Sequence, residues 1–261
     1  MSRSLRVFLM ATSVMTVLRA DVARAAGPCD DLPSQSALRA ALSAAQSESN
    51  GGFGLNMWAT LVNRDGIVCA VAFTGVSRGD QWPGSRVISA QKANTANAFS
   101  LPGLALSTAN LYSAVQGGGS LFGLQHSNPV NTDVAYGGSP SAYGTASDPM
   151  VGGRIGGVNV FGGGLGLYSA PRGLVGGIGV SGDSSCADHN IAWRTRANLG
   201  LDHFAPNQTG GVSGDAQRPD NIVYDITPQA GQMEGVSAGG WGHPVCSAAA
   251  KTIAGGLPAV K

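Results

Sequence analysis

Residues 174–182 read LVGGIGVSG, and this stretch decides the fold that the sequence predicts. Its bulky residues Leu174, Val175, Ile178 and Val180 are typical of a β-strand buried in a protein core. The glycines between them carry no side chain, so a neighbouring backbone is able to approach the strand closely. The stretch therefore predicts a buried strand with another element packed tightly against it.

Two patterns in the chain imitate catalytic or cofactor motifs. Residues 177–182 fit G-x-G-x-x-G, and Asp202 follows 20 residues later, but these glycines lie inside the strand instead of in a turn between strand and helix. Residues 235–239 fit G-x-S-x-G, with His243 after them, but no acidic residue follows Ser237 as a hydrolase of that type requires. We therefore expect neither dinucleotide binding nor serine hydrolase chemistry, and no residue set identifies a catalytic site.

The regular elements around the strand follow from periodicity and turn residues. Helices are expected over residues 33–49, 85–99 and 185–199, and strand-like runs over residues 55–62, 67–73, 158–161, 165–168 and 174–180. Asp65-Gly66 is a hairpin signal between two of these runs. Ser85 is the expected N-cap of the second helix, and Asp183 or Ser184 that of the last.

Two segments lack this periodicity. Residues 117–157 are rich in Gly, Ser, Asn and Pro, and a loop of that length is uncommon in a compact domain. We interpret it either as an extended surface arm or as a binding lid. Residues 205–261 are punctuated by Pro and Gly and are expected to form a C-terminal extension to a domain of residues 26–204.

The N-terminus has the pattern of a secretory signal peptide over residues 1–25. Arginines at positions 3 and 6 precede an uncharged run of 12 residues, 7–18, and Ala23-Arg24-Ala25 supplies a small-x-small cleavage pattern. That run is shorter than the roughly 20 residues of a membrane span. We therefore expect a periplasmic or secreted protein, with no membrane span once the signal is cleaved.

The charge and the cysteine content are consistent with a periplasmic or secreted protein. Cleavage would remove four arginines and one aspartate, which moves the formal charge from +1 to about −2 and gives no electrostatic reason to bind nucleic acid. Four cysteines in an oxidising compartment favour two disulfides, for which three pairings exist. We expect Cys186 to pair with Cys246 and Cys29 with Cys69; the alternative is that Cys69 is a buried thiol. No cysteine pair or histidine pair stands at zinc-finger spacing, so zinc is not expected.

Several segments, in order, resemble the family of haem-binding and haem-degrading proteins that includes the glycolate-operon accessory protein and the secreted streptomycete haem-binding protein. These segments are the turn at residues 63–66, the helix ISAQKANTA at 88–96, the glycine turn GGGLGL at 162–167, VGGIGVSG at 175–182 and Asp188. The resemblance covers roughly residues 34–201. It implies an α+β domain of profilin-like topology, with an antiparallel sheet and packed helices, often assembled into homo-oligomers. It also implies that a helix crowds Gly177 and Gly179.

The chain departs from the family pattern in three places. Gly166 stands where proline is usual, and His189 stands where an acid is usual after the aspartate. The third departure is added length: residues 117–157 enlarge a connection that is normally short, and residues 205–261 are extra.

The resemblance implies haem or a related tetrapyrrole as ligand, and breakdown of haem enters as an activity only by this route. Haem needs an apolar cleft and an axial ligand. We expect His189 or His203 as that ligand and Lys92 as a partner of a propionate, with a solvated helix-face lysine as the alternative. The glycine turn with Gly163 and Gly164 and the helix start at Asp188 are expected beside the cleft. These six residues, His189, His203, Lys92, Gly163, Gly164 and Asp188, are the predicted binding site.

A second hypothesis treats the protein as a non-catalytic accessory or structural protein without a ligand. In this interpretation the glycine-rich arm, with Phe122, Tyr136 and Tyr143, wraps a neighbouring subunit. Saturable binding of haem distinguishes the two hypotheses.

Overall fold

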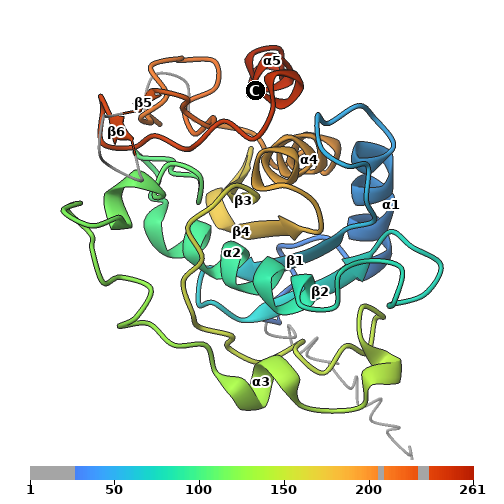
Figure 1. The fold of residues 1–261 in the computed structure, drawn as a ribbon. Helices are drawn as coiled ribbons and strands as arrows, with labels where there is room; N and C mark the ends of the chain where they lie inside the picture. The colour runs from blue at the N-terminus through green and yellow to red at the C-terminus, as the bar shows by residue number, and fades with distance from the viewer. Residues whose placement is uncertain (1–26, 205–208, 229–234) are drawn as a thin grey trace, which may run out of the picture.

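A computed structural model describes residues 27–204, 209–228 and 235–261. The predicted signal peptide lies outside these ranges. Four antiparallel strands, β1 (Trp58–Asn63), β2 (Val68–Phe73), β3 (Gly164–Ser169) and β4 (Gly173–Ser181), form one sheet in the order β2-β1-β4-β3. Helix α2 (Ser85–Phe99) packs on one face of this sheet, and α1 (Gln35–Gln46) and α4 (Ser185–Asn198) pack on the other (Figure 1). The predicted α+β class with an antiparallel sheet is confirmed.

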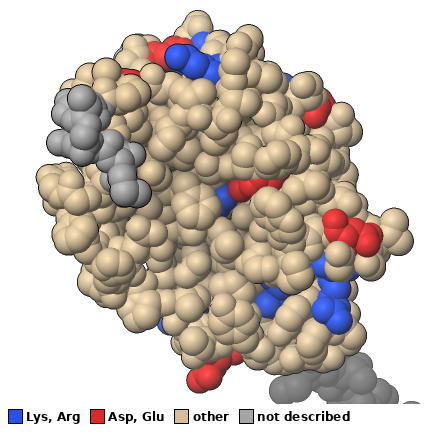
Figure 2. All heavy atoms as spheres, in the orientation of Figure 1, with Lys and Arg blue, Asp and Glu red and all other residues tan. Residues whose placement is uncertain are grey.

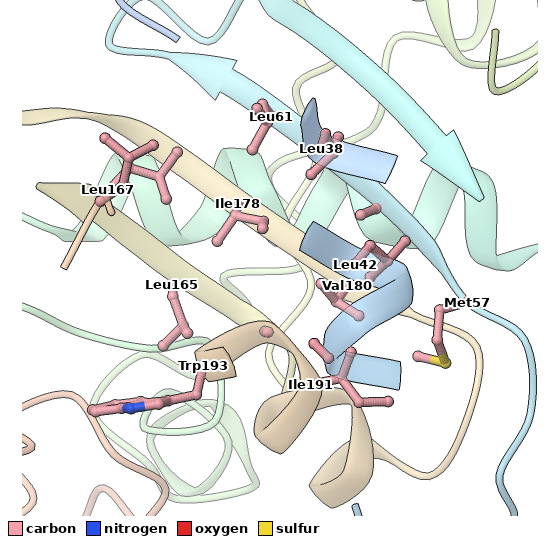
Figure 3. Close-up of a cluster of buried hydrophobic side chains, with 14 of the residues drawn as sticks. Leu38, Leu42, Met57, Leu61, Leu165, Leu167, Ile178, Val180, Ile191 and Trp193 are labelled. Atoms are coloured by element: carbon pink, nitrogen blue, oxygen red, sulfur yellow. The ribbon is translucent and has the colours of Figure 1, made fainter. Parts of the chain in front are cut away.

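The central strand β4 explains why both faces are covered so closely. Ile178 and Val180 project into the core beneath α1 and α4, together with Leu61 of β1 and Leu165 of β3 (Figure 3). On the other face, a Cβ at Gly179 would lie 1.9 Å from the carbonyl oxygen of Ser89 in α2. The prediction that a helix crowds the strand glycines is confirmed, and the G-x-G-x-x-G match is a strand.

The first strand pair is joined as the sequence predicts. Gly66 adopts φ +74°, a left-handed conformation that suits glycine, and its N–H donates to the carbonyl of Asn63 at 3.0 Å. The Asn63 side chain accepts from the N–H groups of Asp65 and Ile67 at 3.0 and 2.9 Å. A side-chain amide therefore fixes this hairpin from within.

The predicted N-cap of helix α2 is wrong, and residues 117–157 contain elements that the sequence did not predict. Ser85 is the first residue of α2 and not its N-cap, which is Gly84 and makes no side-chain cap bond. Residues 117–157 contain a short helix, α3 (Thr132–Tyr136), and 3-10 turns lie at Ser113–Val115 and Pro140–Ala142. This segment buries Ala135, Met150 and Ile155 against the α2 face, because these residues are apolar anchors spaced among its polar ones. In the prediction of the last helix, Ser184 is correct, since its side chain accepts from Ala187 N–H.

The C-terminal segment packs onto the domain. It contains a strand pair, β5 (Ile226–Thr227) and β6 (Val236–Ser237), and a helix, α5 (Ala248–Gly255), none of which was predicted from the sequence. Ala250, Ala254 and Leu257 are buried in the same core as α1 and α4. Figure 1 shows α5 beside α4 at one edge of the molecule. The described residues of this segment, 209–228 and 235–261, are called the tail below.

Both expected disulfides form: Cys29 is bonded to Cys69, and Cys186 to Cys246. Cys69 is therefore not a buried thiol. Within the described ranges, no helix is long and apolar enough to cross a membrane. The face of the molecule in Figure 2 carries only scattered charged groups, as expected of a chain with 12% charged residues.

Candidate functional site

Lys92 and Asp188, both predicted site residues, form a buried ion pair. Lys92 extends from α2, and its Nζ donates to Asp188 Oδ2 at 2.7 Å and to the carbonyl of Val180 at 3.0 Å. Asp188, in the first turn of α4, also accepts from the N–H of Asp183 at 2.9 Å. Lys92 is fully buried. Its ammonium is thus engaged inside the protein, and it is not the solvated helix-face lysine of the alternative interpretation.

Glycines make room for this lysine. A Cβ on Gly179 would lie 2.9 Å from Lys92 Cβ, and one on Gly163 would lie 2.9 Å from Lys92 Nζ. Gly164 has a similar role, because its Cβ would lie 2.6 Å from the carbonyl of Lys92. The glycine turn and the strand glycines therefore fill the space around Lys92 with backbone. They do not line an open cleft next to it.

Burial decides the electrostatics of the pair. Desolvation raises the pKa of Asp188 to about 6 against the opposing effect of Lys92, and it lowers the pKa of Lys92. The Phe161 ring, whose centroid is 4.9 Å from Lys92 Nζ, adds a cation–π contact. The pair links α2 to the start of α4, and Gly163 of the glycine turn lies beside both side chains.

His189, the first predicted axial ligand, is fully buried next to this pair in α4. Its Nε2 lies 3.1 Å from Asn221 Oδ1 and 3.2 Å from the backbone nitrogen of Ile222, both in the tail. Its Nδ1 has no hydrogen-bond partner among the described residues. Desolvation lowers the pKa of His189 to about 3, so the imidazole is neutral at physiological pH. The tail therefore covers this histidine.

His203, the second predicted ligand, is half-buried at the end of the family-like core. Its backbone N–H donates to the carbonyl of Tyr168 at 3.0 Å, and Tyr168 N–H donates to the carbonyl of Leu201 at 2.9 Å, so this segment pairs with β3. In the described part of the chain, no hydrogen bond joins its ring to Lys92, Asp188 or His189. The structure thus gathers Lys92, Asp188, Gly163, Gly164 and His189 in one buried cluster and leaves His203 apart.

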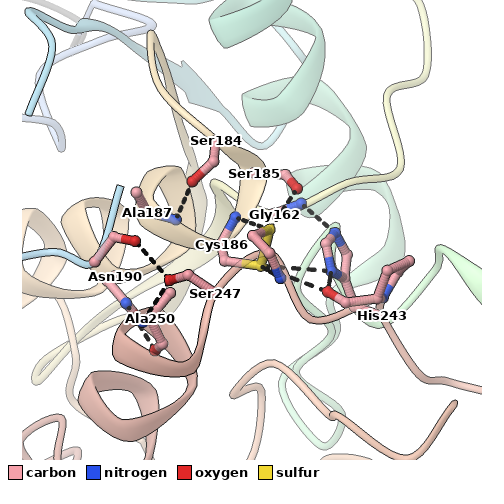
Figure 4. Close-up of a disulfide and its surroundings, with 12 residues drawn as sticks. Gly162, Ser184, Ser185, Cys186, Ala187, Asn190, His243, Ser247 and Ala250 are labelled. Carbon is pink, nitrogen blue, oxygen red and sulfur yellow. Dashed lines mark hydrogen bonds between the residues drawn. A yellow bond between two sulfur atoms is a disulfide. The ribbon is translucent and has the colours of Figure 1, made fainter. Parts of the chain in front are cut away.

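His243, which follows the rejected G-x-S-x-G match, has a structural role. Its Nδ1 lies 2.7 Å from the carbonyl oxygen of Pro244, and its Nε2 accepts from Gly162 N–H at 3.4 Å (Figure 4). Burial lowers its pKa to about 4. The Ser237 hydroxyl donates to Asp225 Oδ1 at 2.7 Å. Ser237 and His243, which the G-x-S-x-G match would pair, therefore have different partners.

An open pocket in the described part of the chain lies between the tail and residues 112–120, which lead into the glycine-rich arm. Its volume is about 940 Å³. It is lined by residues 112–114 and 116–120 on one side and by Ile226, residues 235–237, Gly240 and Pro244 on the other. This pocket was not predicted from the sequence, because its walls come from two segments more than 100 residues apart. The Tyr112 ring packs against the His243 ring at 5.1 Å between centroids, which connects the pocket to the disulfide region.

The sheet with helices on both faces defines an α+β protein. The sequence matches the family described as haem degrading protein HbpS-like over residues 34–196, more than half of its length. The chain belongs to this family.

Three similar solved structures are the following. PduOC in complex with haem is 22% identical, and the match covers 64% of this chain and 91% of that chain with a TM-score of 0.44. The Klebsiella pneumoniae protein ORFY is 22% identical, with 64% and 90% covered and a TM-score of 0.43. A double mutant of HbpS from Streptomyces reticuli is 18% identical, with 73% and 99% covered and a TM-score of 0.41. No curated protein matches the sequence significantly.

Proposed function

We propose that this protein binds haem or a related tetrapyrrole and acts in haem handling outside the cytoplasm. The observation that carries the proposal is membership of a haem-degrading family over residues 34–196. Haem binding requires space for a flat apolar macrocycle and a side chain able to bind iron. The buried cluster around Lys92 and His189 offers neither space nor access while the tail is in place.

The pocket beside the tail fits these requirements better. Its volume of about 940 Å³ lies in the range of small-molecule sites. Tyr112, Ile226, Val236 and Pro244 supply apolar surface in a lining that is otherwise mostly Gly, Ser and Gln. Tyr112 also belongs to a residue type that serves as a haem ligand in some proteins. Bound haem would supply iron redox chemistry, and the residues of this chain would orient the ring and limit its exposure to water.

The test is a titration of the purified mature protein with hemin, followed by the Soret band. We expect a shift that saturates near one equivalent. Gly117 lines the pocket, and a Cβ on it would meet no atom within 4 Å, so Gly117→Leu adds a bulky side chain at the pocket wall without a clash at Cβ. This variant should weaken binding at least about tenfold, which corresponds to about 1.4 kcal/mol.

Gly255→Leu is the matched control, since Gly255 also has open space around it but lies in α5, away from the pocket lining. Its affinity should equal that of the wild type. Unsaturable uptake would contradict haem binding itself. Saturable binding that Gly117→Leu leaves unchanged would contradict only the choice of pocket.

The axial ligand is tested by three single variants, Tyr112→Phe, His203→Ala and His189→Ala. We expect Tyr112→Phe to change the Soret and charge-transfer bands. His189 is fully buried beneath the tail, so a spectral change in His189→Ala alone would mean that the tail opens when haem binds.

Export is part of the proposal and is supported by the signal-like N-terminus and by the two disulfides. Fractionation of the producing cell, with N-terminal sequencing of the exported protein, should give Ala26 as the first residue. The accessory hypothesis has support in Phe122 and Tyr136 of the arm, which stay 67% and 64% exposed. It is favoured if hemin uptake is unsaturable and if Phe122→Ser reduces the oligomer mass in sedimentation.

A further inference from the structure

Three side chains with metal-binding atoms meet where the tail crosses the start of α4. Cys186 lies in the first turn of α4, and His243 and Cys246 lie on the tail. One ligating atom from each is within 4.8 Å of the other two. His243 stands three residues before Cys246, a mixed pair that is overlooked when only cysteine pairs and histidine pairs are considered.

In the disulfide state the two sulfurs bind each other, and no metal site exists among these three residues. Their surroundings nevertheless suit thiolates. Cys246 Sγ accepts from Cys186 N–H at 3.2 Å, and Cys186 Sγ accepts from Cys246 N–H at 3.2 Å. Ser185 Oγ is 3.5 Å from Cys246 Sγ. Backbone donors and a nearby helix N-terminus stabilise a negative sulfur. The groups that would stabilise the thiolates of the reduced form are therefore already in position.

The bond is also reachable from solvent. Cys246 is exposed, whereas Cys186 is fully buried. An external thiolate therefore has access from the tail side.

We propose that reduction of the Cys186–Cys246 disulfide by a dithiol creates a zinc site formed by Cys186, Cys246 and His243. The dithiol transfers two electrons and two protons to the disulfide, gives two cysteine thiols and becomes a cyclic disulfide. Binding of Zn²⁺ then displaces the two thiol protons. Two thiolates and one imidazole suit a tetrahedral zinc ion, whose fourth ligand is water.

The geometry requires only local movement. In a tetrahedral site with zinc–sulfur bonds of about 2.3 Å, the two sulfurs stand roughly 3.7 Å apart, and each is roughly 3.5 Å from the ligating nitrogen. Cys186 Sγ is already 4.0 Å from His243 Nδ1, so opening the sulfur–sulfur bond is the main change. The imidazole would exchange its contacts with Pro244 O and Gly162 N–H for the bond to zinc.

The other disulfide is an internal control. Cys29 and Cys69 are partly buried, and neither belongs to a group of potential metal ligands in the described part of the chain. Cys69 Sγ lies 3.5 Å from the carbonyl oxygen of Ile67, as Cys186 Sγ does from that of Pro244, but among the described residues no N–H donor reaches Cys69 Sγ at hydrogen-bond distance. Reduction of this pair should create no metal site.

The experiment uses the full mature protein, reduced with a phosphine, freed of metal with a chelator and titrated with Co²⁺ without oxygen. One equivalent should produce thiolate-to-cobalt charge-transfer bands and tetrahedral d–d bands, and one equivalent of Zn²⁺ should abolish them. The oxidised protein should show neither. Near-ultraviolet circular dichroism checks that the reduced protein is folded.

Variants locate the site. Cys29→Ser with Cys69→Ser should leave the bands unchanged, and Cys186→Ser with Cys246→Ser should remove them. His243→Asn should weaken Co²⁺ binding at least tenfold and change the d–d bands. A folded, reduced wild type without these bands overturns the proposal, as do bands that persist without Cys186 and Cys246 or that His243→Asn does not alter.

Discussion

The glycine-rich arm, residues 117–157, and the tail are both held to the family-like core by an arginine on a core helix. Arg86 of α2 reaches Asp148 of the arm, with Nε to Oδ2 at 2.9 Å. Arg196 of α4 reaches Asp220 of the tail, with Nη2 to Oδ1 at 3.0 Å. All four side chains are almost completely buried. The same device thus attaches two unrelated additions on opposite faces of the sheet.

The difference lies in what each addition covers. The arm packs Met150 and Ile155 onto the α2 face and contains no cysteine, so no disulfide joins it to the core. The tail carries the Cys186–Cys246 bond and covers His189. The arm therefore completes a core, whereas the tail closes over His189, one of the residues that the sequence predicted to be functional.

Removal of the tail's buried carboxylate should give the largest effect. Asp220→Ala leaves Arg196 buried without its partner, and such a loss costs about 3–5 kcal/mol. Urea denaturation should show the loss in the free energy of unfolding. The double variant Arg196→Met with Asp220→Leu should recover most of it, because no charge is left buried. Equal stability of the single and double variants would mean that lost packing, not the charge, causes the effect.

Loss of either disulfide should be costly, but only one should affect His189. The closed loops span 60 residues for Cys186–Cys246 and 40 for Cys29–Cys69, so loop-closure entropy predicts similar losses of about 4 kcal/mol for replacement by serine. Thermal unfolding measures the losses. Hydrogen exchange should rise in residues 220–224 only when Cys186 and Cys246 are replaced. Equal exchange in both variants would contradict the view that this bond closes the tail.

Acid should loosen the tail through His189. Its pKa is about 3 in the fold against 6.5 for a free histidine side chain, so the unfolded chain binds more protons between these values. The stability contributed by the neutral imidazole is present above pH 6.5 and is lost as pH falls, by about 2 kcal/mol at pH 5 relative to pH 7. The difference in unfolding free energy between wild type and His189→Asn should shrink by that amount over the same range. A constant difference would show that His189 titrates normally and is not covered.

The core was predictable from sequence because its signals are local. Gly177 and Gly179 interrupt an apolar strand, which indicates a close neighbour. The family resemblance implies that this neighbour is a helix. The Lys92–Asp188 pair joins residues 96 positions apart, and only the fold brings them together. Helix α5 was missed because Gly and Pro on both sides obscure the run AAAKTIAG, although Ser247 caps it by accepting from Ala250 N–H. The pocket was beyond prediction, since its two walls lie in segments without periodicity.

The smallest effect should come from an ion pair of the same chemistry in the same segment as Asp220. Arg218 Nη1 lies 2.7 Å from Asp215 Oδ2, and this hydrogen bond is the main cause that lowers the pKa of Asp215. The Asp215 side chain is 41% exposed, so water screens the pair, and Asp215→Ala should change the unfolding free energy by less than about 1 kcal/mol. Urea denaturation beside Asp220→Ala measures both. A loss from Asp215→Ala as large as that from Asp220→Ala would mean that the tail depends on its number of ion pairs and not on their burial. The expected contrast instead shows that the burial of Asp220, and not the number of ion pairs, makes its contact with Arg196 important for attachment of the tail.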